Sequence, residues 1–236
     1  MDSESNFTSF FDSWLTRQEA FLRQLEALLS PADGFDRNRE CAAIIPRVFS
    51  HYQEMYMEKA ALAGEDVFLL MSAPWLSSFE RTLVWISGFR PSMLFPMIET
   101  AVAEDLSDEQ KREIEGVKAE IRRKEREINQ KMARVQETVA EPPLCGLVKK
   151  FGRLVDGETT ELEAAMVELK AAMLVVVGNA DELRGWTAAA VVGILNPVQG
   201  VKFFAAVARF QLQARKWGVE KDRQRCHVSA NGVFLN

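Results

Sequence analysis

Side chains that could carry acid–base, nucleophilic or metal chemistry are few in this chain of 236 residues. Its only histidines and cysteines are His51, His227, Cys41, Cys145 and Cys226. Cys226 and His227 are adjacent in an expected tail, which is a poor geometry for a nucleophile and its base. His51 lies at the edge of an apolar helix face, where a structural histidine is favoured. The three cysteines have no close spacing and cannot all pair, which favours a reducing intracellular compartment.

Motifs for nucleotide, metal or acyl-transfer chemistry are missing from the sequence, which contains no GxGxxG, Walker loop, HExxH, GxSxG or CxxC. Glu113, Glu115 and Glu120 lie near one another, but Lys118 and Arg122 are interleaved with them. This pattern is typical of a solvated helix face with i,i+4 pairs, not of a metal cluster. We therefore predict a protein that is not an enzyme, with no catalytic residue, no cofactor and no metal.

A locally basic stretch runs from Lys111 to Arg134, where nine lysines and arginines outnumber five glutamates. The acids are spread through the stretch, whereas a DNA-reading basic region is denser in arginine and precedes a zipper. A second basic run, from Arg209 to Arg225, lies where cations complement a helix C-terminus. We predict solvated faces for both runs and no direct DNA binding.

Four aromatic residues occupy two turns of the first predicted helix: Phe7, Phe10, Phe11 and Trp14. Aromatic residues at this spacing would let the helix dock into an apolar groove of a partner protein. The alternative is that they close the core of the fold, which the spacing alone favours. If the helix docks on a partner, we predict Phe10, Phe11 and Trp14 as the binding residues.

The elements that must position these residues are helices. Apolar residues recur in steps of three and four, and no alternating run indicates a strand. Ser77 with Glu80, Ser107 with Gln110 and Thr160 with Glu163 have capping-box spacing, and Asn196-Pro197 is a further helix start. Helices are predicted at about 7–29, 40–63, 77–88, 91–102, 107–140, 144–155, 160–195 and 196–223, with a short apolar piece at 67–71, turns at Pro142-Pro143 and Asp156-Gly157, and a break allowed at Gly178-Asn179.

The composition indicates one domain. Glycine and proline number only 13 and 8, hydrophobic residues make up 47%, and the net charge is −5. We predict an all-α fold, a single bundle of about eight helices with one long charged helix, over residues 7–223, followed by a tail at 224–236. No signal peptide is visible, and the longest uncharged stretch, from Gly185 to Val201, is too short and too interrupted to cross a membrane. We therefore expect a soluble protein.

Several segments resemble the plant Delay of Germination (DOG) domain, which also forms the C-terminal part of TGA-type bZIP transcription factors. The most specific are W-x9-W-I-x-G-F-R-P, from Trp75 to Pro91, and L-x-P-V-Q-G, from Leu195 to Gly200. Further similar segments are WLTRQ, SHYQEMYMEKA, EDVF, LSDEQ, ARVQETVA and ADELR. Since Met1 lies a few residues before the match, the resemblance implies a free-standing Delay-of-Germination-like protein. Its GFRPS and EPPL segments are most similar to the branch associated with seed maturation and abscisic acid responses.

The resemblance implies a role in seed dormancy or maturation and abscisic acid signalling, in the nucleus and cytoplasm. The dormancy regulator of this family binds type 2C protein phosphatases through an N-terminal stretch ending in Trp. Here the match is Phe11-Asp12-Ser13-Trp14, with the intervening residues rearranged. A transcriptional co-regulator that acts with a bZIP partner is the alternative, and a homodimer through the long helix remains open.

Some proteins of this family bind small ligands, so the resemblance implies that this chain should be considered for haem and for an acyl chain. The dormancy regulator binds haem through two histidines four apart on the last helix, where this sequence has Gln211 and Arg215. Neither ligates iron as imidazole does, so no haem is expected there. TGA-type relatives can hold a fatty acyl chain, and apolar helices from Met166 to Leu195 would line such a slot, or would simply form bundle core.

Overall fold

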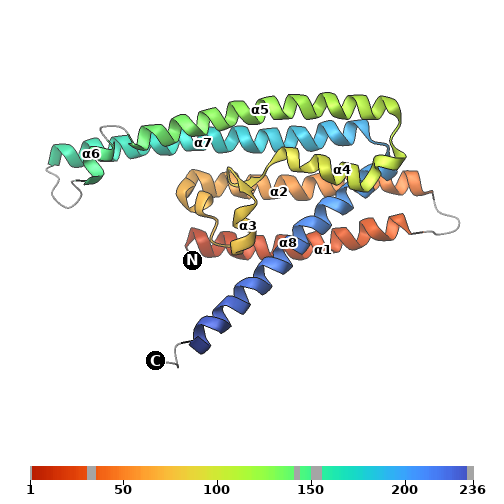
Figure 1. Ribbon diagram of the computed structural model, residues 1–236, viewed down its shortest axis with the longest axis horizontal. Helices are drawn as coiled ribbons and strands as arrows, with labels where there is room; N and C mark the ends of the chain where they lie inside the picture. Colours follow the sequence, from red (N-terminus) through yellow and green to blue (C-terminus); the bar gives the residue numbers. More distant parts are fainter. Residues whose placement is uncertain (1, 31–35, 141–143, 150–155, 233–236) are drawn as a thin grey trace.

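Eight α-helices make up most of the part of the chain that the structure describes (Figure 1). This computed structural model describes residues 2–30, 36–140, 144–149 and 156–232, and of 147–149, 156–158 and 227–232 only the backbone. The helices are α1 (Ser3–Leu29), α2 (Arg37–Ser72), α3 (Ser78–Thr82), α4 (Leu94–Val102), α5 (Asp108–Ala140), α6 (Leu144–Lys149), α7 (Asp156–Ile194) and α8 (Pro197–Gly232). Two short 3₁₀ turns, η1 (Pro91–Met93) and η2 (Ala103–Asp105), flank α4. The predicted all-α bundle with one long charged helix is confirmed.

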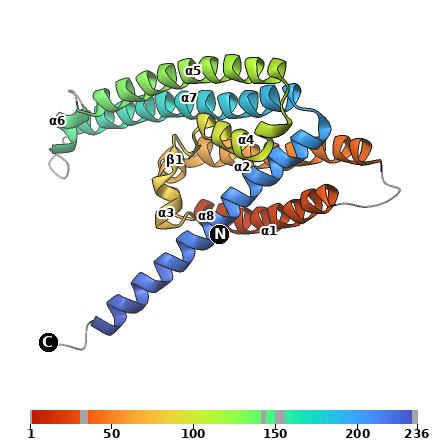
Figure 2. The ribbon, with the colours of Figure 1, turned by 45° about the vertical axis from the view of Figure 1, so that its right-hand side comes forward.

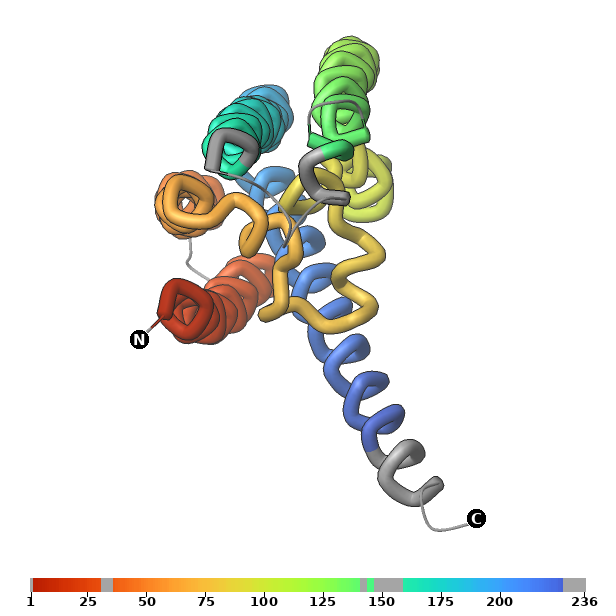
Figure 3. The backbone as a smooth tube through the Cα atoms, turned by 90° about the vertical axis from the view of Figure 1, so that its left-hand side faces the viewer, coloured from red at the N-terminus to blue at the C-terminus, as the bar shows by residue number. Residues whose placement is uncertain are grey.

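The helices pack in two connected groups. α1, α2 and α8 contact one another, while α5 and α7 run side by side, and α7 also packs on α2 (Figure 1). α8 crosses the other helices obliquely, contacting α1 to α4, and its C-terminal part projects beyond them, which Figure 2 and Figure 3 show from two further sides. None of the helices within the described residues has an apolar stretch long enough to cross a membrane.

The predicted apolar spacings form the core. Along α5, Ile114, Ile121, Ile128 and Val135 recur every seven residues and are all buried, which joins this otherwise charged helix to α7. The first helix likewise buries Phe7, Phe11, Trp14 and Leu25.

Three of the predicted helix starts are present as hydrogen bonds. Ser77 and Glu80 form a reciprocal capping box, and Ser107 with Gln110 does the same before α5. Asn196 accepts from the N–H of Gln199, whose side chain accepts from the N–H of Asn196.

The start predicted at Thr160 and Glu163 is wrong. α7 begins at Asp156, so this pair lies inside the helix, and Asp156-Gly157 is helical rather than a turn. α7 also continues through Gly178-Asn179, where a break was allowed. The turn at Pro142-Pro143 lies outside the described residues.

The second helix is longer than predicted. α2 begins at Arg37, nine residues before Pro46, so this proline does not mark its start. The predicted apolar piece at 67–71 is its final part, set off by non-helical backbone angles at Asp66. The Asp66 carboxylate accepts from the N–H groups of Phe68 and Leu69, so it caps the resumed helix.

The helix predicted at 77–88 is wrong beyond Thr82. Val84–Trp85 (β1) and Gly88–Phe89 (β2) form a two-stranded antiparallel hairpin instead, although no strand was expected. Ile86 and Ser87 at its turn have φ of 45° and 60°. Two consecutive positive φ angles match the right-handed twist of a hairpin, but they are costly for a β-branched residue such as Ile86. Contacts from α7, described below, hold the turn in place.

The expected domain limits, residues 7–223 with a tail from 224, stay a prediction. α8 keeps its helical backbone through Gly232, so regular structure does not stop at residue 224.

Candidate functional site

A cavity of about 360 Å³ lies inside the bundle, between α1, α2, α7, α8 and the β1–β2 hairpin. Aromatic side chains dominate its lining, among them Phe7, Phe11, Trp14, Tyr56, Phe203 and Phe204. Of the stretch from Met166 to Leu195 that was expected to line an acyl slot, only four residues of α7 contribute: Arg184, Gly185, Ala188 and Ala189. Volume and apolar lining are typical of sites that take small organic molecules.

Two of the three predicted partner-binding residues lie inside the fold. Phe11 and Trp14 are buried, and both line the cavity. The Trp14 indole stacks on His51 with ring centroids 4.4 Å apart and planes 6° apart, and its Nε1–H donates to the His51 carbonyl at 2.9 Å. Trp14 therefore ties α1 to α2 and closes one side of the cavity.

Phe10 is the one of the three that reaches the surface. Its side chain is half-buried, with its ring 5.8 Å from that of Phe7 and the Arg17 guanidinium 5.9 Å above it. It is flanked by the exposed Ser9 and Ser13. A partner that docks on α1 in this structure meets Phe10 and not Phe11 or Trp14.

The imidazole of His51 is buried between Trp14 and Phe21, and its Nε2 has no hydrogen-bond partner within the described residues. Burial lowers the pKa of His51 to about 4, and the positive charge of Arg17 adds to this effect. The folded protein thus keeps this histidine neutral.

Because folding lowers the pKa of His51, its contribution to stability is complete above the unfolded pKa of 6.5 and is lost as pH falls toward about 4. Below pH 6.5 we expect the free energy of unfolding of the wild type to fall relative to His51→Gln, with a limiting slope of about 1.4 kcal/mol per pH unit. Urea unfolding of both proteins at a series of pH values measures this difference. Parallel curves would show that His51 does not titrate on unfolding.

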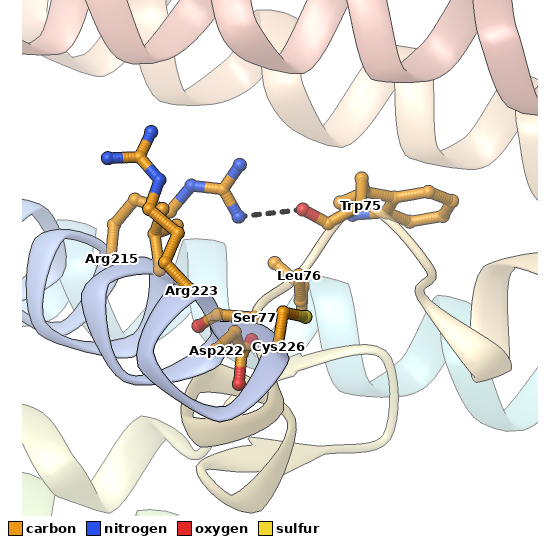
Figure 4. Close-up of a pocket in the computed structure, with 8 residues that line it drawn as sticks. Trp75, Leu76, Ser77, Arg215, Asp222, Arg223 and Cys226 are labelled. Carbon is orange, nitrogen blue, oxygen red and sulfur yellow. Dashed lines mark hydrogen bonds between the residues drawn. The ribbon is translucent and has the colours of Figure 1, made fainter. Parts of the chain in front are cut away.

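The two positions where haem ligands were considered are occupied by hydrogen-bonded side chains. The Gln211 carbonyl oxygen accepts from the Tyr52 hydroxyl and the Gln18 amide, each at 2.8 Å. Arg215 donates to the carbonyl of Trp75 at 2.7 Å, as Figure 4 shows, and it also donates to Glu80 at 3.1 Å. Neither group ligates haem iron, so the residues present do not fit haem.

A second hollow, open to solvent and about 350 Å³ in volume, lies where α8 crosses the segment from Trp75 to Ser77 (Figure 4). Arg215 and Arg223 contribute cations, and Cys226 is exposed at its edge. The Asp222 carboxylate also lines the hollow and accepts a hydrogen bond from the N–H of Ser78 at 2.8 Å. Among the described residues, no three His, Cys, Asp or Glu side chains group as metal ligands.

Two buried cations and the carboxylate that they share lie at one side of the cavity. Lys59 from α2 and Arg184 from α7 are 6% exposed, and both line the cavity. The Lys59 ammonium lies 2.8 and 3.1 Å from the two carboxylate oxygens of Asp181, and Arg184 pairs with the same carboxylate. Burial lowers the pKa of Lys59 to about 8 although Asp181 opposes the shift, and burial raises the pKa of the neighbouring Tyr56 to about 12.

Arg184 also holds the hairpin. Its guanidinium donates to the carbonyl oxygens of Trp85, Ile86 and Phe89, the last two at 2.8 and 2.7 Å. A Cβ at Gly88 would lie 2.9 Å from the guanidinium carbon, so any larger residue there would have to displace the guanidinium from the hairpin. One buried side chain thus satisfies three carbonyls and stabilises the turn with positive φ angles.

The basic stretch of α5 is a solvated face, as predicted. Arg123 pairs with Glu120 and Glu127, and Lys118 pairs with Glu115 and with Glu99 of α4. These cations are therefore partly neutralised by carboxylates on the same surface, which disfavours binding of the phosphate backbone of a nucleic acid.

Lys59, Asp181 and Arg184 were not singled out as site residues from the sequence. Asp181 and Arg184 are three apart on one helix, which is a common surface pairing. Lys59 is 122 residues away from Asp181, and no spacing rule joins them. A lysine amid apolar and aromatic residues of α2 was the only available signal.

Comparisons with known proteins show similarity along nearly the full chain. A family model described as seed dormancy control (DOG1) matches residues 21–100. Protein ZW2 of Arabidopsis thaliana is 38% identical over 222 residues, 92% of this chain and 98% of that protein. Protein RESPONSE TO ABA AND SALT 1 of the same plant is 38% identical over 230 residues, 94% of this chain and 97% of that protein. Transcription factor TGA5, also of A. thaliana, is 28% identical over 201 residues, 84% of this chain but 60% of its own length.

Proposed function

Because the chain belongs to the DOG1 family of seed-dormancy-control regulatory proteins, we propose that it acts without enzymatic activity, through protein partners, in seed dormancy or maturation and abscisic acid signalling. The observation that carries this proposal is the similarity over more than nine-tenths of the chain to two relatives, one of which is named for its response to abscisic acid and salt. We propose the nucleus and cytoplasm as its location, since the TGA relatives are transcription factors.

The partner that we propose is a type 2C protein phosphatase bound at the N-terminal half of α1. In this arrangement Phe10 touches the partner directly, because it is the half-buried member of the predicted set. Phe11 and Trp14 position the helix from inside. α1 presents this side next to exposed polar residues, among them Asp12, so a partner can approach without unfolding the bundle.

Replacing Phe10 with alanine is expected to weaken phosphatase binding at least about 10-fold, the effect typical of truncating an aromatic anchor at an interface. Fold and stability should change little beyond the loss of partial packing. Pull-downs and calorimetric titration with purified type 2C phosphatases of the abscisic acid pathway measure the effect. Met57→Ala, which truncates an exposed apolar side chain on α2, is the matched control. If neither protein binds, the phosphatase proposal is wrong. If wild type and Phe10→Ala bind equally, the contact assigned to Phe10 is wrong.

A second candidate is a transcriptional co-regulator that joins a bZIP partner. It is supported by the 84% of this chain that aligns with TGA5, whose remaining length lies outside the match. A mobility-shift assay at about 50 and 200 mM salt tests it, because a specific complex survives at the higher salt. This candidate requires a shift that appears only when chain and bZIP protein are both present.

A third candidate is a small-ligand-binding module, which the 360 Å³ apolar cavity favours. Haem does not fit the last helix, so the ligand would be an organic molecule such as an acyl chain. Binding of apolar probes to the purified protein tests this candidate.

A further inference from the structure

The charges around the cavity can be assigned pair by pair. Arg90 lines the cavity and pairs with the buried Glu125 at 2.7 Å. Glu80 also lines it and pairs with Arg215 at 3.1 Å, and Arg215 lies a further 3.7 Å from Asp12, a carboxylate that is 63% exposed and does not line the cavity. Each of these pairs brings one positive and one negative charge, so neither leaves an excess.

The third group is not balanced. Lys59 and Arg184 share the single carboxylate of Asp181. In the part of the chain described, no other carboxylate lies within ion-pair distance of either cation. Tyr56, beside them, is neutral because burial raises its pKa to about 12. One positive charge is therefore in excess within this group of three.

An excess charge in this place is costly. Lys59 and Arg184 are buried, and the side chain of Asp181 is only 14% exposed. Buried charges are normally paired, since an unpaired one loses its hydration without compensation. The other N–H groups of Arg184 donate to the hairpin carbonyls. The Lys59 ammonium has three N–H donors, and it contacts both carboxylate oxygens of Asp181. Lys59 is therefore the cation best able to donate to a further acceptor.

Building on the ligand-binding candidate above, we propose that the cavity takes a compact apolar molecule with a single anionic group, a carboxylate, which pairs with Lys59. One negative charge neutralises the group of three, whereas a dianionic phosphate would replace the positive excess with a negative one. The apolar remainder of the ligand lies against the aromatic lining. The volume of about 360 Å³ is near the lower end of the range for ligand pockets, so the molecule is small.

Matched probes test the proposal on the full chain. We use two carboxylates, naphthoate and decanoate, with their neutral counterparts naphthylmethanol and decanol, and naphthyl phosphate as the dianion. Dissociation constants come from calorimetry or from the fluorescence of Trp14 and Trp75, which line the cavity. For at least one skeleton we expect the carboxylate to bind about 10-fold or more tightly than its alcohol, and naphthyl phosphate to bind less tightly than naphthoate.

Lys59→Met removes the excess charge and leaves Asp181 and Arg184 as a one-to-one pair, so the variant should fold. In it the carboxylate and the alcohol should bind with similar dissociation constants, while alcohol binding is unchanged from wild type. Lys216→Met, at an exposed position of α8, should keep the wild-type preference.

The outcomes separate the two levels of the proposal. If the wild type binds acids and alcohols equally, the anion preference is wrong and the ligand-binding candidate stands. Tighter binding of naphthyl phosphate would also overturn the single-charge assignment. If no probe binds, both the inference and the ligand-binding candidate are wrong. The wild-type comparison decides without any variant, so it holds even if Lys59→Met fails to fold.

Discussion

Trp14→Ala is expected to lower the free energy of unfolding by about 3–5 kcal/mol, the usual cost of truncating a buried large aromatic residue. The indole is 4% exposed, stacks on His51 and donates a hydrogen bond to the His51 carbonyl. The substitution removes the buried indole surface, the ring stacking and the hydrogen bond. It also enlarges the existing cavity by the volume of the indole, which the surrounding helices are not expected to fill. Urea or thermal unfolding followed by circular dichroism measures the loss.

Trp217→Ala is the matched control, because that indole is 51% exposed and packs mainly on Phe79. It should cost about 1 kcal/mol or less. Equal losses from the two substitutions would show that Trp14 does not tie α1 to α2 as described. The comparison also matters for the binding experiments. If Trp14→Ala loses partner binding, a displaced α1 is enough to explain the loss, so Phe10→Ala is the variant that tests the interface.

Arg184→Met should lower the free energy of unfolding by about 3–5 kcal/mol, because a buried acceptor left without its donor typically costs about 1–3 kcal/mol and this substitution strips several. The charge itself is not the main loss, because Lys59 and Asp181 remain as a balanced pair. The loss comes from the carbonyls of Trp85, Ile86 and Phe89, which lose their donor next to a turn with two positive φ angles. Equilibrium unfolding measures the change in the free energy of unfolding. Near-UV circular dichroism, to which Trp85 contributes, reports on the hairpin.

Arg184→Lys should not restore the wild type, because one ammonium cannot reach a carboxylate and three carbonyls in the planar arrangement of a guanidinium. Arg17→Ala is the surface control: its pair with Glu54 is exposed by 41% and 47% and should contribute less than about 1 kcal/mol. A lysine variant as stable as wild type would contradict the role assigned to Arg184.

Periodicity and caps were enough to predict the bundle. The seven-residue repeat of α5 and the aromatic spacing of α1 placed the correct residues in the core, because a helix must bury one face. Capping boxes failed only at Thr160, where the spacing is present but the helix begins upstream. Such a local pattern can sit inside a helix as well as at its start, and the sequence does not distinguish the two.

The hairpin and the charged group were not predicted for one shared reason. The backbone at Ile86 and Ser87 is unfavourable locally and is held by Arg184, about a hundred residues further along the chain. Lys59 likewise meets Asp181 only after α2 and α7 pack. Single-sequence patterns describe neighbours within a few residues, so features created by packing lie beyond them.

One consequence follows from α1 being both the proposed docking helix and a wall of the cavity. Phe10 lies one residue from Phe11, which lines that cavity, so any partner that shifts α1 also reshapes the space behind it. Binding on the two sides of this helix is then thermodynamically linked. Whatever factor a ligand imposes on partner affinity, the partner must impose on ligand affinity, in the same direction. A molecule held by Lys59 would thereby act as an effector of recognition at Phe10, although the two never touch.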